Sequence, residues 1–146
     1  MLFLRDATSD DLELLLTWAN DPCTRQNSFH TEMISYEEHE RWFGRMMKDP
    51  DQIQYILMED DTPVGQIRIR KEQGKGEISY SVAPEARGKG YGKKLLQLAE
   101  EKILAEHPEI EALTAAVKAE NSVSSHLFLQ EAYEMQYTMF EKKIRS

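Results

Sequence analysis

Cysteine is almost absent from this sequence, and long apolar runs are absent altogether. Cys23 is the only cysteine among 146 residues, so no internal disulfide can form, which fits a reducing compartment. No stretch approaches the roughly 18 apolar residues of a membrane-spanning helix. Residues 1–6 carry charge too early for a secretory signal peptide. We therefore expect a cytoplasmic protein with no membrane partner.

Positive charge is also scarce. The chain has 18 lysines and arginines against 26 aspartates and glutamates, which gives a formal net charge of -8. This acidic balance argues against a general nucleic-acid-binding protein. No cluster of histidine, cysteine and acidic residues has the spacing of a metal site. We expect one domain, 1–146, with no nucleic-acid partner and no metal.

The periodicity of apolar residues divides the chain into strands and helices. Thr8, Ser35 and Asn121 each precede a helical pattern and are favourable N-caps. Residues 22–34 are expected to be irregular. The expected strands are 2–7, 53–59, 64–70, 77–83, 112–117 and 133–144, and the expected helices are 8–19, 35–48, 90–106 and 121–132. The order of strand, two helices, three antiparallel strands, helix, strand, helix and strand predicts a mixed α/β domain on a central sheet.

The most informative segment is Arg87-Gly88-Lys89-Gly90-Tyr91-Gly92, which joins an expected strand to an expected helix. Glycine permits positive φ and a close approach of the backbone to a ligand. The N–H groups of a helix N-terminus attract anions, so the segment predicts a phosphate cradle. It is not a P-loop, because Lys94 stands where serine or threonine is needed. It is not a dinucleotide fingerprint, because Lys93 replaces the third glycine.

The pattern Arg87-x-x-Gly90-x-Gly92 resembles the acyl-CoA signature of the GNAT superfamily of N-acetyltransferases. The resemblance extends to the preceding strand Ile78–Pro84, to Ala115–Val117, to Asn121 and to Leu127–Phe128. The expected element order matches the family fold along essentially the whole chain. The resemblance therefore implies a GNAT fold and acetyl-CoA as the acyl donor.

In that family the loop amides hold the pyrophosphate of CoA, and a free strand edge binds the pantetheine arm through backbone hydrogen bonds. Asn121 has a second explanation as a plain helix N-cap. The residues that the resemblance places at the cofactor are Val82, Ala83, Arg87, Gly88, Lys89, Gly90, Tyr91, Gly92, Lys93, Asn121 and Ser124.

The resemblance also suggests catalytic roles. The Val82 amide is the expected donor to the oxyanion, and Glu77, at the start of the same strand, is a candidate general base that acts directly or through water. Members of the family often use a tyrosine to protonate the departing sulfur, but Phe128 stands at that position and has no proton to give. The substitutes in this sequence are Tyr80, Tyr133 and His126, unless the thiolate leaves unassisted.

The acceptor side is expected in the segment from Trp18 to Phe43. Its pattern resembles N-acetyltransferases of nucleotide-linked amino sugars, such as the enzyme of the pseudaminic acid pathway, and more loosely the ribosomal-protein N-terminal acetyltransferases. Arg25 is a candidate for binding phosphate, and His39 for accepting the amine proton, with Glu77 as the competing base. The aromatic residues here are equally expected in the core. The candidate substrate residues are Arg25, Ser28, His39, Trp42 and Tyr80.

We therefore expect an acetyl-CoA-dependent N-acetyltransferase that acts on a small primary amine, with the amino group of a nucleotide-linked sugar as the favoured acceptor. A protein N-terminal acetyltransferase is the first alternative. A non-catalytic acyl-CoA-binding module is the second, and Phe128 is its main support. A homodimer is a further expectation, because many relatives pair through their C-terminal strands.

Overall fold

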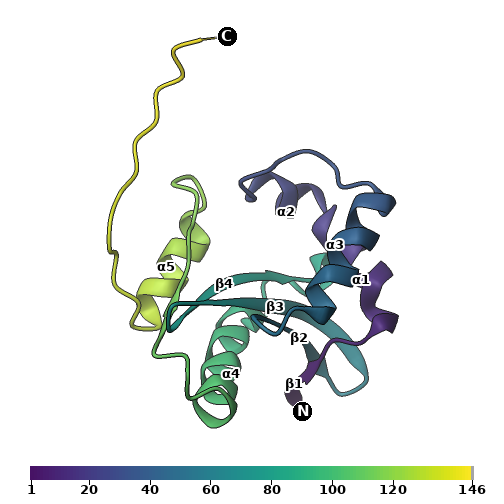
Figure 1. Cartoon of the computed structure of the whole chain (residues 1–146). Helices are drawn as coiled ribbons and strands as arrows, with labels where there is room; N and C mark the ends of the chain where they lie inside the picture. The colour runs from purple at the N-terminus through teal and green to yellow at the C-terminus, as the bar shows by residue number, and fades with distance from the viewer. Residues whose placement is uncertain (146) are drawn as a thin grey trace.

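A computed structural model describes residues 1–145 and shows five strands in one mixed sheet, in the order β1-β2-β3-β4-β5 (Figure 1). The first four strands are antiparallel neighbours, and β5 pairs with β4 in parallel. The strands are β1 (Leu2–Asp6), β2 (Gln52–Glu59), β3 (Thr62–Glu72), β4 (Lys75–Val82) and β5 (Ala112–Thr114).

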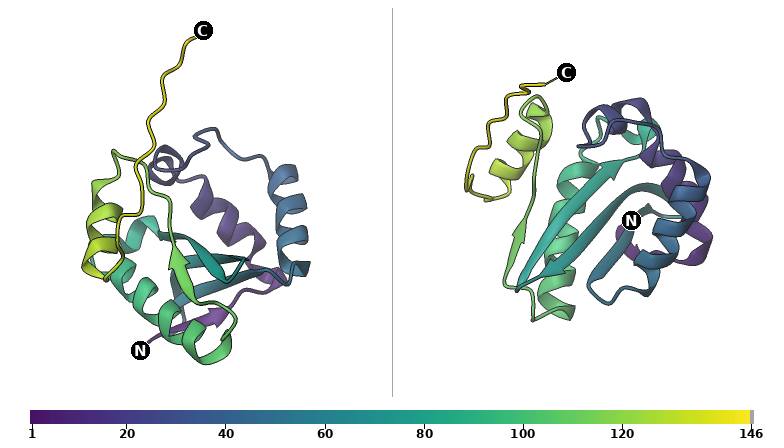
Figure 2. Two further views of the ribbon diagram at one scale, coloured as in Figure 1. Left: turned by 60° about the vertical axis from the view of Figure 1, so that its left-hand side comes forward. Right: turned by 45° about the horizontal axis from the view of Figure 1, so that its top comes forward.

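Helices cover both faces of the sheet. Helix α4 lies against one face, while α1 and α3 lie over the other, as the two further views in Figure 2 show. The helices are α1 (Leu12–Ala19), α2 (Pro22–Gln26), α3 (Tyr36–Lys48), α4 (Tyr91–Glu106) and α5 (Ser122–Gln130), with single 3-10 turns at Ser9–Asp11 and Pro84–Ala86. No helix within residues 1–145 has both the length and the apolar character needed to cross a membrane.

The three predicted helix caps are confirmed. Thr8 and Asp11 form a reciprocal capping box, and Ser35 accepts the N–H of Glu38. Asn121 accepts the N–H of Ser124. Local side-chain chemistry therefore sets where these helices begin.

The two faces of the sheet differ in polarity. Tyr55, Ile67 and Ile69 point to the α4 face and are at most 1% exposed, in a core that also contains Leu95. The alternate residues point to the other face, because side chains on a strand alternate between faces. On that face, Arg68 of β3 lies between its cross-strand neighbours Gln54 on β2 and Ser79 on β4. Both faces thus contribute to the core, but the face under α1 and α3 also carries a polar patch around Arg68.

Two expectations about secondary structure are wrong. Residues 22–34 are not wholly irregular, because Asp21 caps the short helix α2 and Pro22 occupies its first turn. The predicted last strand, 133–144, pairs with no other strand in the structure and projects from the body of the protein (Figure 1). Its alternating apolar residues Met135, Tyr137 and Met139 are exposed. The mixed α/β architecture up to α5 is otherwise as predicted.

Candidate active site

A cleft of about 1530 Å³ opens between the acceptor-side segment and the glycine loop. Its walls come from α1 to α3, from the loop before α4 and from α5, and its floor comes from β2, β3 and β4. It contains most of the residues predicted from the sequence: Arg25, Ser28, His39, Trp42, Tyr80, Val82, Arg87, Gly88, Gly90, Tyr91, Gly92, Lys93, Asn121 and Ser124. The fold therefore brings the expected donor and acceptor residues to one place.

Strands β4 and β5 separate beside this cleft. They pair only from Lys75 to Glu77 of β4, so the rest of that edge of β4 has no strand partner within residues 1–145. Ala83 donates its N–H to Val64 O at 2.9 Å. Successive residues of an antiparallel strand direct their N–H groups to opposite sides, so the Val82 N–H points into the gap. An extended, amide-containing ligand fits such an edge.

The same geometry limits what Ala83 offers to a cofactor, and its role there stays a prediction. Its N–H is bonded to Val64, its carbonyl accepts the N–H of Ala86 at 2.9 Å, and the residue is 0% exposed. Ala83 is not part of the cleft wall, and its N–H is not available to a cofactor. Lys89 also lies outside the cleft wall, on the exposed surface of the loop.

The glycine loop has the geometry of an anion cradle. Gly88 and Gly90 have φ of 80° and 82°, in the left-handed region that other residues avoid. A Cβ at either position would meet no atom within 4 Å, so the space over the loop is open. The N–H of Lys94 bonds to Gly90 O at 3.3 Å and starts the helical hydrogen bonds of α4. The preceding N–H groups are thus available to a phosphate.

Tyr91 contributes to the loop through its backbone, because its side chain is anchored elsewhere. Its ring is 7% exposed, and its hydroxyl donates to Glu59 Oε2 at 2.5 Å. This hydrogen bond, together with burial, raises the pKa of Tyr91. The contact ties the start of α4 to the end of β2.

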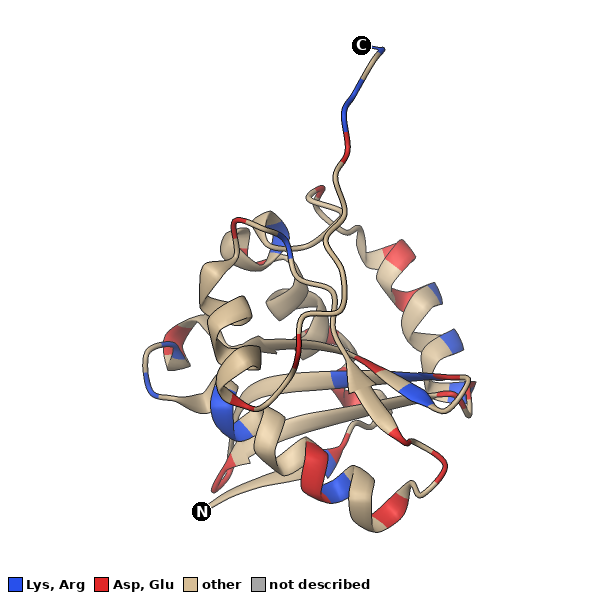
Figure 3. Ribbon diagram, turned by 90° about the vertical axis from the view of Figure 1, so that its left-hand side faces the viewer, with Lys and Arg blue, Asp and Glu red and all other residues tan. Residues whose placement is uncertain are grey.

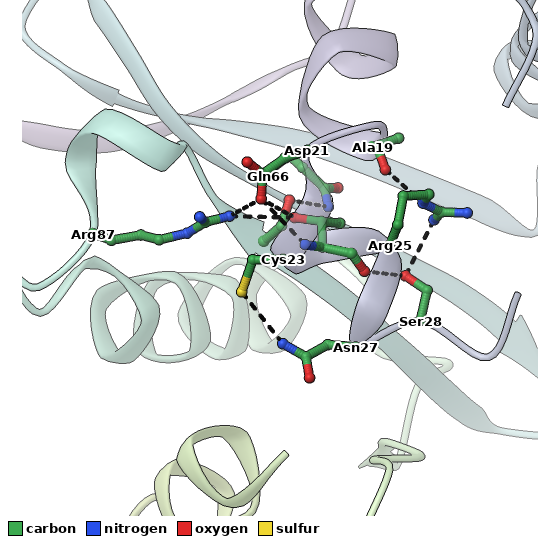
Figure 4. A network of polar contacts seen from close by, with 10 residues as sticks. Ala19, Asp21, Cys23, Arg25, Asn27, Ser28, Gln66 and Arg87 are labelled. Carbon is green, nitrogen blue, oxygen red and sulfur yellow. Dashed lines mark hydrogen bonds and ion pairs between the residues drawn. The ribbon is translucent and has the colours of Figure 1, made fainter. Parts of the chain in front are cut away.

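Arg87, the first residue of the glycine motif, reaches across to the acceptor side. Its guanidinium points to the Asp21 carboxylate (Figure 4) at 2.5 Å, and it lies 3.4 Å from the Thr24 hydroxyl. Burial alone would raise the pKa of Asp21, but the bonds from Arg87 and from the Thr24 N–H hold it below its usual value. Donor-side and acceptor-side segments are therefore joined by an ion pair.

Arg25 organises the acceptor segment. Its Nε donates to Ala19 O at 2.6 Å, and its Nη2 donates to Ser28 Oγ at 3.1 Å (Figure 4). Its Nη1 donates to the carbonyls of His30 and Glu32. Burial lowers the pKa of this guanidinium. The N–H donors of Arg25 therefore hold the segment from Ala19 to Glu32 in place, which is a positioning role. The binding of phosphate by Arg25 stays a prediction.

Tyr80 lies next to the phenylalanine that replaces the family tyrosine. Its ring meets Phe128 edge-on at 5.8 Å, and its hydroxyl is 2.7 Å from Ser124 Oγ. Burial raises the pKa of Tyr80, although the Ser124 contact lowers it in part. The phenol therefore keeps its proton at neutral pH. His126 also lines the cleft, whereas the buried Tyr133 hydroxyl has no hydrogen-bond partner and lies outside the cleft wall.

His39 is the buried histidine of the cleft wall, which also includes the exposed His30 and His126. It is 3% exposed, and its Nε2 lies 2.8 Å from Leu12 O, so this nitrogen carries the proton. Burial lowers the pKa of His39, and the bond to Leu12 offsets part of that effect. The ring is thus neutral at pH 7 with a free lone pair on Nδ1. Trp42 contacts His39 at 5.6 Å, whereas Trp18 is a core residue at 4% exposure.

Glu77, the other candidate base, lies outside the cleft wall. Its carboxylate is exposed and pairs with Arg70 at 3.2 Å. At the rise of an extended strand, Glu77 lies roughly 16 Å from Val82, which is too far for direct proton transfer. A base at this position requires a chain of waters, and the role of Glu77 stays a prediction.

Sequence reasoning missed a group of polar residues on the sheet floor of the cleft. Gln54 Nε2 donates to Gln66 Oε1 at 2.8 Å, and Gln66 Nε2 donates to Ser81 Oγ at 3.1 Å. Arg68 lies beside them, with its guanidinium carbon 4.8 Å from the centre of the Trp42 ring. The available signal was polar residues at every second position of two expected strands. Within residues 1–145, no three histidine, cysteine or acidic residues are arranged to hold a metal ion.

A family model described as an acetyltransferase (GNAT) domain matches residues 1–130. A comparison with curated protein sequences gives no match. Among solved structures, a domain from Methanocaldococcus jannaschii DSM 2661 superposes with a TM-score of 0.82 at 22% identity, over 97% of this chain and 93% of that chain.

Two acetyltransferase structures have the same architecture. A spermidine N-acetyltransferase from Vibrio cholerae, solved with CoA and spermine, superposes with a TM-score of 0.80 at 20% identity, over 88% of this chain and 78% of that chain. The aminoglycoside acetyltransferase AAC(6')-Ib, solved with ribostamycin and CoA, gives a TM-score of 0.82 at 20% identity, over 94% and 86%. These likenesses confirm the predicted fold.

Proposed function

This chain belongs to the GNAT acetyltransferase family, and on that premise we propose that it transfers the acetyl group of acetyl-CoA to the primary amine of a small molecule. The observation that supports this most strongly is the free edge of β4 beside a glycine loop with two left-handed glycines. An extended amide-containing arm fits the edge, and a pyrophosphate fits the loop. The two acetyltransferase structures described above were themselves solved with CoA.

The donor site in this proposal extends from β4 to α5. The loop from Gly88 to Lys93 binds the pyrophosphate through N–H groups, with Lys93 adding charge at the cleft wall. The Val82 N–H serves the acetyl end. Asn121 is engaged as the cap of α5, so its contribution is to hold Ser124 and the helix in place.

When bound, acetyl-CoA supplies an acetyl thioester: the amine nitrogen bonds to the acetyl carbon, the carbon–sulfur bond breaks, the amine loses a proton and the sulfur gains one. The Val82 N–H donates to the oxygen that becomes negative. His39, neutral at pH 7, accepts the amine proton through Nδ1. Tyr80 holds a proton on its hydroxyl for the departing sulfur. Phe128 therefore does not exclude catalysis, since Tyr80 provides a phenol beside it.

The acceptor in this proposal is an amino sugar carried on a nucleotide. Trp42 offers an aromatic face in the cleft, and the hydrogen-bonded Gln54, Gln66 and Ser81 offer polar groups to hydroxyls. The sequence pattern from Trp18 to Phe43 supports the same class. A peptide N-terminus is the competing acceptor.

Release of free thiol from acetyl-CoA tests this proposal. The protein should release thiol with a UDP-linked amino sugar and not with peptides that have free N-termini. Thiol release with peptides alone would replace the sugar by a protein acceptor. Binding of acetyl-CoA, measured by calorimetry, without thiol release for any amine would identify a binding module.

A further inference from the structure

Arg68 is a desolvated cation on the floor of the cleft that forms no salt bridge with any residue described here. It is half-buried on β3, and none of the salt bridges within residues 1–145 includes it. The nearby carboxylate of Glu77 pairs instead with Arg70. Desolvated charges in proteins are normally paired, so an arginine in this position is suited to bind an anionic ligand.

The ring of Trp42 fixes Arg68 without neutralising it. The guanidinium carbon lies 4.8 Å from the ring centre, the distance of a cation–π contact. Such stacking uses one face of the guanidinium and leaves the N–H groups at its edge for a ligand. Burial is the main cause that lowers the pKa of Arg68, followed by the charge of Arg70, and the more distant Glu77 carboxylate offsets only part of this effect. An anion bound in the cleft would raise the pKa of Arg68 and so oppose the effects of burial and of Arg70.

Other charged residues around Arg68 also give the cleft a positive potential. The cleft wall contains six lysines and arginines (Arg25, Arg41, Arg45, Arg68, Arg87 and Lys93) against two acidic residues (Glu32 and Glu38). On α3 the charge changes from acidic in the first turn to basic in the last, as Figure 3 shows by the change from red to blue. A cationic cleft in a chain of net charge -8 is a local feature and does not follow from composition.

We propose that Arg68 binds an anionic group of the acceptor, a phosphate or a carboxylate, so that this enzyme acetylates amines that also carry negative charge. This inference rests on the proposed function, because it assigns a substrate class to the same cleft. Arginine matches both groups through paired N–H donors. A polycation such as spermidine is repelled by the same residues. The proposed acceptor class therefore differs from spermine and ribostamycin, with which the two acetyltransferase neighbours were solved.

The test uses matched amine pairs that differ in one anionic group. Glucosamine 6-phosphate is compared with glucosamine for phosphate, and β-alanine with β-alaninamide for carboxylate, with spermidine as the polycation. Binding to the CoA-saturated protein is measured by calorimetry, and thiol release from acetyl-CoA is measured separately. At least one anionic member should bind about 10- to 100-fold more tightly than its neutral partner. Which pair shows the preference distinguishes phosphate from carboxylate.

Variants assign the preference to Arg68. Arg68→Met should remove it, and Arg68→Lys should keep part of it, because lysine retains charge but not the paired donors. Lys102→Met is the matched control, since Lys102 lies 5.2 Å over the Tyr55 ring on the opposite face of the sheet. It removes the same kind of contact outside the cleft and should leave the preference intact. Affinity for CoA should be unchanged in all three variants, which also checks that they fold.

The outcomes separate the two proposals. Equal binding within both pairs, or a preference that survives in Arg68→Met, overturns the role of Arg68 even if thiol is released. If the wild type prefers the anionic amine and Arg68→Met loses that preference, the anion site is supported. If no amine causes thiol release in the same experiments, the transfer reaction is contradicted. The wild-type comparison requires no variant, so the proposal stays testable if Arg68→Met does not fold.

Discussion

The guanidinium of Arg87 lies 2.5 Å from the carboxylate of Asp21, although the two residues are 66 positions apart. Arg87 begins the glycine loop, and Asp21 caps α2 by accepting the Thr24 N–H. One carboxylate therefore holds a helix of the acceptor segment and an arginine of the donor loop. Any anion that binds the loop competes with Asp21 for the charge of Arg87.

Asp21→Asn should bind acetyl-CoA more tightly and fold less stably. Asparagine is as good a helix cap as aspartate, so the change removes charge and keeps the cap. The lost surface ion pair should lower the free energy of unfolding by about 0.5 kcal/mol. Removal of a negative charge beside the loop should improve the dissociation constant by about two- to fivefold. Thermal unfolding and calorimetry measure the two effects.

Asp60→Asn is the control for this variant. Asp60 pairs with the N-terminal amine at 2.7 Å, and its φ of 53° is one that asparagine tolerates. It should lose a similar ion pair without any change in acetyl-CoA affinity. Unchanged or weaker acetyl-CoA binding by Asp21→Asn would contradict the competition described above.

Gly90→Ala should weaken acetyl-CoA binding by tenfold or more. The φ of Gly90 is 82°, and an alanine there is strained by about 1–2 kcal/mol whether or not space is available. Relief of that strain would turn the loop N–H groups away from the phosphate. Gly44→Ala is the matched control, because Gly44 lies within α3 and a Cβ there meets nothing within 4 Å. It should raise stability by about 0.5–1 kcal/mol and leave binding unchanged. Equal affinities for the two variants would exclude the cradle.

Tyr80→Phe should lower kcat by about 100-fold, because the proton for the departing sulfur is lost. Its affinity for acetyl-CoA should change little, since the hydroxyl contacts Ser124. Tyr133→Phe is the control from the same aromatic cluster, 4.9 Å from Phe128. It removes a buried hydroxyl without a partner, so stability should rise by about 1 kcal/mol at unchanged kcat. Wild-type kcat in Tyr80→Phe would show that the thiolate leaves unassisted.

His39 should make stability and turnover fall as the pH is lowered below neutrality. Burial lowers its pKa in the folded protein from the ordinary 6.5, so the unfolded chain binds more protons at mildly acidic pH. The contribution of His39 is fully present above pH 6.5 and is lost as the pH falls from there to the lowered value. Comparison of unfolding curves for the wild type and His39→Gln from pH 8 to pH 5 isolates this contribution.

The same comparison addresses the choice of base. In His39→Gln, kcat should fall, and the acidic limb of kcat/KM should disappear. Glu77→Gln should keep that limb, because Glu77 is exposed and paired with Arg70. The reverse pattern would transfer the base to Glu77 acting through water.

The donor half of the site was predictable because its information is local. The spacing of Gly88, Gly90 and Gly92 specifies a turn into a helix, and the cap at Asn121 is a single-residue signal. Their positions in the structure agree with the sequence patterns within a few residues. The adjacent gap between β4 and β5 was expected only from the family resemblance.

The acceptor half was less predictable because its neighbours are set by strand register. Arg68 meets Gln54 and Ser79 only once β2, β3 and β4 are aligned, and β2 contains an irregularity between Leu57 and Met58. The alternating pattern at 133–144 predicted a strand, but pairing also requires an available partner, which a local pattern does not provide. Helix α2 was missed because Asp21 and Pro22 were interpreted as the end of α1, although they also mark a helix start.

The gap between β4 and β5 also has a consequence for how much folded protein a cell contains. Backbone groups left without a strand partner lower the cohesion of that half of the sheet, and a ligand that fills the gap restores it. A ligand that binds only the folded chain raises its stability by about 2.7 kcal/mol at a hundredfold excess over Kd. The abundance of this protein would then follow the supply of that ligand, with degradation of the empty form as the link between them.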